Sequence, residues 1–329
     1  MRIGINGFGR IGRLVFRTAR ENGFEIAGIN DITSAATLAH LLKYDSIHRR
    51  FEGTISSDEN GITVDGKKIP VCAELDPTKL PWGKLGADLV LECTGKFTKR
   101  EEAAKHLTAG ARKVLISAPA KGHDGTFIPG INCSKYDKSK HDVISIGSCT
   151  TNCLAPLVKV ILENFGIVKG YMTTIHAYTA DQKLQDSPHK DLRRARAAAI
   201  SMVPTTTGAA KAISEIFPEV KGKLDGTAVR VPTICGSLVD FSVIVEKDAS
   251  AEQVNTAFKK AAQTSSLSRA LEYCEDPIVS VDIIGNPHGS VFDSLMTWAQ
   301  GNFVKVFSWY DNEWGFSNRM IDMIKVMSK

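Results

Sequence analysis

The stretch RIGINGFGRIG, residues 2–12, decides the fold of the first half of the chain. Its first five residues are typical of a buried β strand, and the next six match G-x-G-x-x-G. Helical apolar spacing follows over residues 10–21, and residues 25–30 form a second predicted strand, which ends at Asp31. Because a strand, a glycine loop, a helix and a second strand occur in this order, we predict a dinucleotide-binding βαβ unit.

Asp31 lies 19 residues beyond the last glycine of the loop, where a ribose-binding carboxylate is expected. A carboxylate there accepts a hydrogen bond from a ribose 2′-hydroxyl and repels a 2′-phosphate, so it favours NAD over NADP. The helix that follows the loop offers free N–H groups to the phosphates. The structural alternative is that Asp31 only closes the strand in an Asx turn.

The rest of the first half alternates further predicted strands and helices. A helix is predicted over 34–43, and the hairpin signals Asn60-Gly61 and Asp65-Gly66 predict a short antiparallel excursion. Strands at 88–93 and 113–117 flank a predicted helix at 99–109. Strand ends in an open parallel sheet form a ligand crevice, so Thr94 and Ser117 are candidates for cofactor contacts. They are equally well interpreted as hydroxyls that cap the next helix.

The motif SCTTNC, residues 148–153, places a cysteine where a predicted strand at 143–146 gives way to a predicted helix ending near 165. A helix start stabilises a thiolate, which makes Cys149 a candidate nucleophile, although a free cysteine is more often a small buried hydrophobe. His176 falls near the end of a predicted strand at 170–178 and would serve as its base. An alternative is a zinc site that uses Cys149, Cys153 and His176.

The second half carries further candidate anion sites. The polar stretch 178–200 contains three arginines and is either an arginine-supplied phosphate site or a solvated inter-subunit loop. Thr207 and Gly208 precede a predicted helix at 209–216, and Arg230 lies on a predicted strand. Strands at 237–245, 278–284 and 303–309 and helices at 250–264 and 317–327 complete the pattern. The predicted fold is α/β: a Rossmann-type doubly wound parallel sheet plus an α+β domain with a mixed or antiparallel sheet.

Composition narrows the class of protein. The 329 residues are 43% apolar and 23% charged, as in a globular protein of one or two domains. Seven scattered cysteines predict reduced thiols and a cytoplasmic setting, and no signal peptide or membrane-spanning run is recognised. A net charge of +5 suits phosphorylated substrates but does not predict nucleic acid as a primary partner.

Six stretches in order along the chain resemble the phosphorylating glyceraldehyde-3-phosphate dehydrogenase family. They are INGFGRIGR (5–13), SCTTNC (148–153), HAYT (176–179), PTTTGAAK (204–211), VRVPT (229–233) and WYDNEWG (309–315). The resemblance implies an oxidoreductase that uses NAD to oxidise and phosphorylate D-glyceraldehyde 3-phosphate to 1,3-bisphosphoglycerate through a cysteine thioester. A sister enzyme that acts on erythrose 4-phosphate is the alternative.

The resemblance also implies roles for single residues. Cys149 matches the nucleophile and His176 the base, and no metal is implied. The implied cofactor contacts are Asn6, Gly7, Phe8, Gly9, Arg10, Ile11, Asp31, Thr94, Ser117 and Asn312. Substrate phosphate and inorganic phosphate are implied at Ser148, Thr150, Thr179, Asp181, Arg194, Thr207, Gly208 and Arg230, with Arg194 chosen over Arg193 and Arg196.

The resemblance implies an NAD-binding domain at 1–148, a catalytic domain at 149–312, and a helix at 313–329 that packs back on the first domain. It further implies a homotetramer. Three departures from the family pattern, Leu75, Ser187 and Phe316, leave the strictness of NAD over NADP open.

Overall fold

The computed structural model describes all residues, 1–329, and divides the chain into two compact units. The first unit comprises Met1–Phe127, Cys133–Gly147 and Met320–Lys329, and the second comprises Ile128–Asn132 and Ser148–Arg319. Ile128–Asn132 joins the second unit because Ile128 belongs to its apolar core and Gly130 packs against Ser266. The return to the first unit falls inside helix α9 (Trp314–Met327), at Met320.

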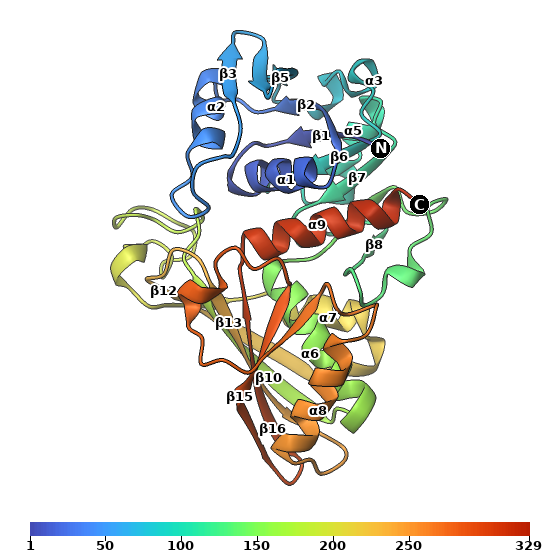
Figure 1. Cartoon of the computed structure of the whole chain (residues 1–329), viewed down its shortest axis with the longest axis vertical. Coiled ribbons are helices and arrows are strands. Elements are labelled where there is room, and N and C mark those ends of the chain that lie inside the picture. Colours follow the sequence, from blue (N-terminus) through green and yellow to red (C-terminus); the bar gives the residue numbers. More distant parts are fainter. The chain divides into compact units, whose positions relative to one another are not determined.

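The first unit is built on a nine-stranded sheet in the order β3-β4-β5-β2-β1-β6-β7-β9-β8. From β5 to β8 the strands are parallel, whereas β3, β4 and β5 form the antiparallel excursion that the two hairpin signals predict. Figure 1 shows this sheet, with β1, β2, β3 and β5 to β8 labelled. The strands are β1 (Arg2–Asn6), β2 (Glu25–Asn30), β3 (Ile55–Asp58), β4 (Gly61–Val64), β5 (Lys67–Cys72), β6 (Leu89–Glu92), β7 (Lys113–Ile116), β8 (Gly125–Thr126) and β9 (Val143–Ser145).

The strand order reverses between β1 and β6, because the chain adds β2 and β5 on one side of β1 and later strands on the other. Such a switch point is where open α/β sheets bind ligands, beyond the carboxyl ends of the strands. The helices of this unit are α1 (Arg10–Glu21), α2 (Ala35–Lys43), α3 (Trp82–Leu85), α4 (Arg100–Ala103) and α5 (Lys105–Thr108). The single helix predicted over 99–109 is therefore two short helices, separated at Ala104.

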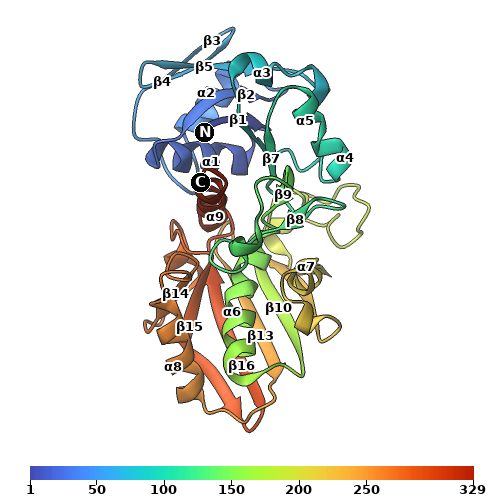
Figure 2. The same ribbon diagram turned by 90° about the vertical axis from the view of Figure 1, so that its right-hand side faces the viewer.

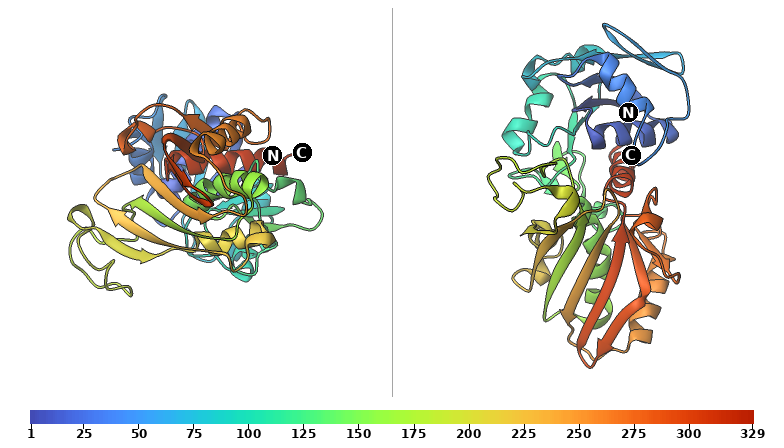
Figure 3. Two further views of the ribbon diagram at one scale, coloured as in Figure 1. Left: turned by 90° about the horizontal axis from the view of Figure 1, so that it is seen from below. Right: turned by 90° about the vertical axis from the view of Figure 1, so that its left-hand side faces the viewer.

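The second unit contains a seven-stranded mixed sheet in the order β11-β12-β10-β13-β16-β15-β14. Figure 2 shows α6 and α8 against one face of this sheet, and the right-hand view of Figure 3 shows the opposite face without a helix in front of it. The elements are α6 (Cys149–Phe165), β10 (Lys169–Ala177), β11 (Val203–Thr206), α7 (Ala209–Ile216), β12 (Leu224–Val231), β13 (Ser237–Ile244), α8 (Ala251–Ala262), β14 (Leu271–Cys274), β15 (Ser290–Gln300) and β16 (Phe303–Tyr310).

Alternation along β13 explains why one face of this sheet is covered. Val239, Phe241 and Val243 are buried in a core with α6, whereas the residues between them are only partly buried. The strand predicted at 278–284 is wrong: Ser280–Ile283 forms a 3₁₀ helix, in which only Ile283 is buried. The fold class is confirmed, with one largely parallel sheet and one mixed sheet. None of the helices has the length and apolar character needed to cross a membrane.

Two glycines of the loop at 7–12 differ in the space around them, which generates a stability prediction. A Cβ on Gly12 would lie 2.1 Å from the carbonyl oxygen of Gly7, whereas a Cβ on Gly9 would meet no atom within 4 Å. We expect Gly12→Ala to lower the free energy of unfolding by about 1–3 kcal/mol, because backbone cannot yield as a side chain can. Gly9→Ala is the matched control and should change the free energy of unfolding by less than about 0.5 kcal/mol. Urea unfolding of the ligand-free protein measures both, and equal values would contradict the prediction.

Candidate active site

Cys149 is the first residue of α6, and the local sequence explains how that helix begins. The hydroxyl of Ser148, at the N-cap, accepts a hydrogen bond from the Thr151 N–H at 3.1 Å. The other free N–H groups of the first turn and the helix dipole favour negative charge at this end. Cys149 is partly exposed as a residue.

The structure brings His176 to Cys149, as the sequence predicts. His176 Nε2 lies 3.4 Å from Cys149 Sγ, and the ring is almost wholly buried near the end of β10. Parallel pairing of β10 with β12 places Arg230 directly beside His176 in the sheet. One helix start and two neighbouring strands therefore supply a thiol, an imidazole and a guanidinium at one point.

Arg230 and a backbone carbonyl surround the second ring nitrogen of His176. Nδ1 lies 2.6 Å from Arg230 Nη1 and 2.6 Å from the carbonyl oxygen of Ala177, and Arg230 Nη1 also donates to that oxygen at 3.0 Å. A guanidinium can only donate. Nδ1 therefore either accepts from Arg230, with the ring proton on Nε2, or carries the proton and donates to Ala177, which leaves Nε2 free to accept from the thiol.

Burial and the Arg230 cation shift the pKa values of both His176 and Cys149. Burial, together with the neighbouring Arg230 cation, lowers the pKa of His176 to about 3. Removal from water raises the pKa of the Cys149 thiol, and Arg230 acts in the opposite direction by stabilising the thiolate. A neutral imidazole next to a thiol can take up the proton that the sulfur loses when it attacks.

Tyr310 is a site residue that our sequence reasoning missed. Its buried hydroxyl lies 2.9 Å from the Thr150 hydroxyl and 2.8 Å from the Thr174 hydroxyl, and its ring packs edge-on against His176. The signal was its place in the stretch WYDNEWG, residues 309–315. The hydroxyl of Thr150 therefore already has one hydrogen-bond partner at the helix start.

Among the three arginines of the 178–200 loop, Arg194 is the one turned inward. Its Nε donates to Thr205 Oγ1 at 2.9 Å, and its Nη1 pairs with Asp181. Arg193 and Arg196 are exposed. Arg194 also contributes to the lowered pKa of His176, after burial and Arg230, which shows that it is electrostatically close to the pair.

The remaining residues proposed for phosphate lie at loop ends of the second unit. Thr179 and Asp181 follow β10, and the carbonyl of Thr179 accepts from the N–H of Gln182. Thr207 Oγ1 accepts from the Ala209 N–H at 3.3 Å, and Gly208 is the N-cap of α7. The contacts of Thr207 and Gly208 therefore lie at the start of α7.

In the first unit, the glycine loop has the close backbone approaches expected for a dinucleotide site. Gly7 has φ 90°, and its N–H donates to the Asn30 carbonyl at 2.8 Å. Asp31 accepts from the Phe8 N–H at 2.8 Å, while the Phe8 ring is fully buried. A Cβ on Gly9, at the N-cap of α1, would meet no atom within 4 Å, so this helix start is open to an anion such as a pyrophosphate.

Other predicted cofactor residues lie at strand ends or carry existing partners. Arg10 pairs with Asp45 at 2.7 Å, and Ile11 is partly buried in the first turn of α1. Thr94 lies just after β6. Ser117 directly follows β7, and its N–H donates to the carbonyl of Glu92. The side chain of Asn6 is buried and bonded to Glu92 and Asn30, so it does not face the loop's open side.

Asn312, in the second unit, has a fixed amide orientation. Its Oδ1 accepts from the Ser237 hydroxyl at 2.9 Å and from the Gly236 N–H at 3.2 Å. The Nδ2 group is left to donate, which fits the carbonyl of a nicotinamide carboxamide. By contrast, Cys153 directs its thiol to the Ser308 carbonyl in the core, so the zinc alternative lacks one of its ligands.

The three family departures occupy different surroundings. Leu75 is 71% exposed, Ser187 is bonded through its N–H to the Ala195 carbonyl, and Phe316 is buried. A buried phenyl ring at 316 offers no hydroxyl to a cofactor.

Comparison with known proteins identifies the family of this chain. Residues 1–100 match the family described as glyceraldehyde 3-phosphate dehydrogenase, NAD binding domain, and residues 148–312 match its C-terminal domain. Curated glyceraldehyde-3-phosphate dehydrogenases from Streptomyces coelicolor and Geobacillus stearothermophilus are each 56% identical, over 98% of this chain and 97% of theirs. One from Bacillus subtilis is 54% identical over 100% of this chain and 98% of its own. The chain therefore belongs to the NAD-dependent glyceraldehyde-3-phosphate dehydrogenase family.

Proposed function

We propose that the protein oxidises D-glyceraldehyde 3-phosphate and phosphorylates the product to 1,3-bisphosphoglycerate, with NAD as cofactor. The observation that carries this is the 3.4 Å contact between Cys149 Sγ and His176 Nε2 at the start of α6. Family membership supports the reaction, and the curated relatives that we find carry the name glyceraldehyde-3-phosphate dehydrogenase. The alternative substrate, erythrose 4-phosphate, is not favoured.

The proposed reaction begins when Cys149 attacks the aldehyde carbon and His176 takes the thiol proton. The developing oxyanion is stabilised by N–H groups at the start of α6. When bound, NAD supplies the acceptor for the hydride of the hemithioacetal, which leaves a thioester on Cys149. Inorganic phosphate then attacks the thioester carbon, the sulfur leaves as thiolate, and the acyl phosphate departs.

The proposed phosphate sites use the cations and helix starts around this pair. Arg230 and Thr179 hold the substrate phosphate, and Arg194 with Asp181 borders it. Ser148, Thr150, Thr207 and Gly208 provide N–H groups and hydroxyls from the starts of α6 and α7 for the attacking phosphate. Bidentate donation suits arginine for this role.

We also propose that the protein works as a homotetramer in the cytoplasm. Leu184, Leu192, Ile200 and Met202 of the loop after β10 are each at least 75% exposed, which is unusual for large apolar side chains that have no partner. All seven cysteines are free, as expected in a reducing compartment.

Replacement of the Cys149 sulfur tests the proposed nucleophile. Cys149→Ser should lower phosphate-dependent NADH formation from glyceraldehyde 3-phosphate by more than about 10³-fold, because a hydroxyl is a far weaker nucleophile than a thiolate. NAD binding, measured by calorimetry, should persist. Cys153→Ser is the control and should keep activity, since a hydroxyl can also donate to Ser308. Near-full activity of Cys149→Ser would exclude the thioester route.

Replacement of the His176 imidazole tests the proposed base. His176→Asn should lower kcat by about 10²–10⁴-fold, the usual contribution of general acid–base catalysis, and should slow alkylation of Cys149 by iodoacetate at neutral pH. His288→Asn, which removes a histidine that pairs with Glu272, provides the control. Alkylation at the wild-type rate would separate His176 from the thiol.

Replacement of the Arg230 guanidinium tests how the reactivity of Cys149 depends on pH. Arg230 lowers the pKa of Cys149 by stabilising the thiolate, so Arg230→Gln should raise that pKa. The thiolate fraction then falls at any given pH, and the midpoint of the alkylation profile should move upward by about one pH unit. Arg196→Gln, which removes an exposed arginine paired with Asp186, should leave it in place. A downward or absent shift in Arg230→Gln would mean that its cation does not act on the sulfur.

A further inference from the structure

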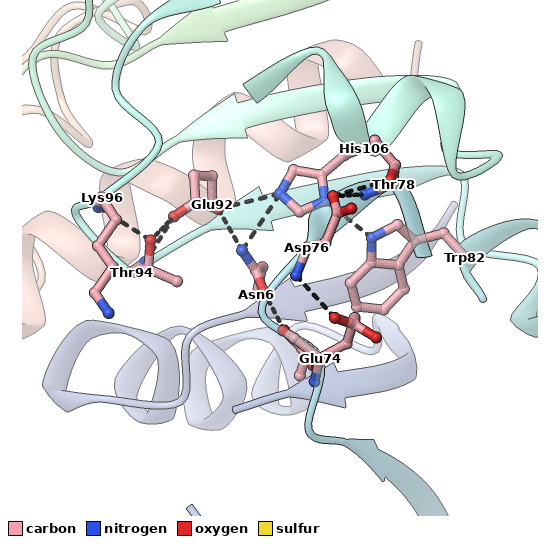
Figure 4. Close-up of polar contacts among 10 residues, drawn as sticks. Asn6, Glu74, Asp76, Thr78, Trp82, Glu92, Thr94, Lys96 and His106 are labelled. Atoms are coloured by element: carbon pink, nitrogen blue, oxygen red, sulfur yellow. Dashed lines mark hydrogen bonds and ion pairs between the residues drawn. The ribbon is translucent and has the colours of Figure 1, made fainter. Parts of the chain in front are cut away.

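Glu92 is a buried carboxylate at the carboxyl end of β6, and it contacts Asn6, Thr94 and His106 (Figure 4). One oxygen accepts from the Thr94 N–H at 2.8 Å and from the Thr94 hydroxyl. The other accepts from Asn6 Nδ2 at 2.6 Å and lies 3.1 Å from His106 Nε2. Both oxygens are thus surrounded by donors, which offset the free energy of burying the charge.

The neighbours of His106 define its proton arrangement. The ring is fully buried, and the indole N–H of Trp82 lies 3.0 Å from Nδ1. Because an indole N–H can only donate, Nδ1 must accept, and the ring proton is on Nε2, where it donates to Glu92. The ring of His106 is therefore held between the indole of Trp82 and the carboxylate of Glu92 (Figure 4).

Asn6 extends the network to a third strand. Its Oδ1 accepts from Asn30 Nδ2 at 2.7 Å, and Asn30 bonds to the backbone of Glu74 in both directions at 2.9 Å. Asn6, Asn30 and Glu92 are the last residues of β1, β2 and β6. Asn6 and Glu92 are also paired in register across the switch point of the sheet.

The same network fixes two sides of the glycine loop. Gly7 follows Asn6 directly, and a Cβ on Gly7 would lie 2.7 Å from the Thr94 nitrogen. Thr94 itself is held by both its N–H and its hydroxyl to Glu92. A shift of the Glu92 carboxylate therefore moves Asn6 and Thr94, and with them the backbone that faces the cofactor.

We propose that Glu92 and His106 are positioning residues that hold the glycine loop in its dinucleotide-binding shape before the cofactor arrives. Neither side chain contacts the cofactor in this proposal; each acts through Asn6 and Thr94. Preorganisation of this kind raises affinity by removing the entropy loss of ordering the loop on binding. The inference rests on the use of NAD in the proposed function.

The test measures binding of NAD and of ADP-ribose by calorimetry, which does not depend on catalysis. In either orientation, the amide of Glu92→Gln points its N–H₂ group at donors from Thr94 or from Asn6 and His106. A buried donor is then left unpaired, so we expect Kd for both ligands to rise about 10-fold or more. At saturating NAD, kcat should stay near the wild-type value, while KM for NAD rises. Glu25→Gln, at the opposite end of the same sheet, should change neither quantity.

A second pair of variants separates positioning from packing. Glutamine at 106 can accept from Trp82 and donate to Glu92, as the neutral imidazole does, whereas leucine can do neither. We therefore expect His106→Gln to bind ADP-ribose nearly as tightly as the wild type and His106→Leu to bind it about 10-fold more weakly. Equal affinity of the two variants, or unchanged affinity in folded Glu92→Gln, would overturn the proposal.

Two measurements distinguish failure of the network proposal from failure of the proposed function. The rate of Cys149 alkylation in the ligand-free variants should match the wild type, because that thiol depends on His176 and Arg230. If ADP-ribose binds the wild-type protein while Glu92→Gln binds it equally well, the network proposal alone is wrong. If the wild type binds neither ligand, the proposed use of NAD is wrong and the network proposal falls with it.

Discussion

The contact between Cys149 Sγ and His176 Nε2 is the constraint on which the second unit depends. It requires that the first turn of α6 and the end of β10 meet, although 27 residues separate them. The apolar residues of α6 pack against the buried, alternating apolar residues of β13. This packing brings the start of α6 and the end of β10 together. The hydroxyl of Tyr310 is hydrogen-bonded to Thr150 and Thr174, and its ring packs against the imidazole of His176. The site is therefore a consequence of how one helix lies on one face of a mixed sheet.

Preorganisation is the common feature of the two units. In the second unit, Arg230 is held against the imidazole and a carbonyl before any substrate phosphate is present. In the first unit, the donors around Glu92 hold the ends of three strands and the loop between them. Each arrangement buries charge among fixed partners, so little reorganisation remains when a ligand binds. Asn312 follows the same principle, since Ser237 and Gly236 decide which end of its amide donates.

Much of the fold could be predicted from the sequence, because most elements have strong local signals. The βαβ unit at 2–30, both hairpin turns and the helices at 209–216 and 250–264 follow from apolar periodicity, glycine and capping residues. The predictions failed where tertiary contacts outweigh local pattern. Residues 280–283 look like a strand but form a 3₁₀ helix with Val281 64% exposed, and β15 was missed because Leu295, Met296 and Trp298 along it are exposed. A half-buried strand is normally revealed by alternating apolar and polar residues, and apolar side chains at the exposed positions of β15 remove that alternation.

The sequence by itself determined the chemistry: a thiol at a helix start, a histidine, a glycine loop with Asp31 and a set of arginines. These are residue types and short spacings, and both are read directly along the chain. Only the tertiary structure decided which of them meet. Pairing of β10 with β12 set Arg230 beside His176, folding of a loop turned Arg194 inward but left Arg193 and Arg196 outside, and the switch point of the sheet joined Asn6 to Glu92 and His106. The physical reason is that hydrogen bonds and burial act over a few ångströms in space, whereas Arg230 and His176 lie 54 residues apart in sequence and Asn6 and Glu92 lie 86 apart.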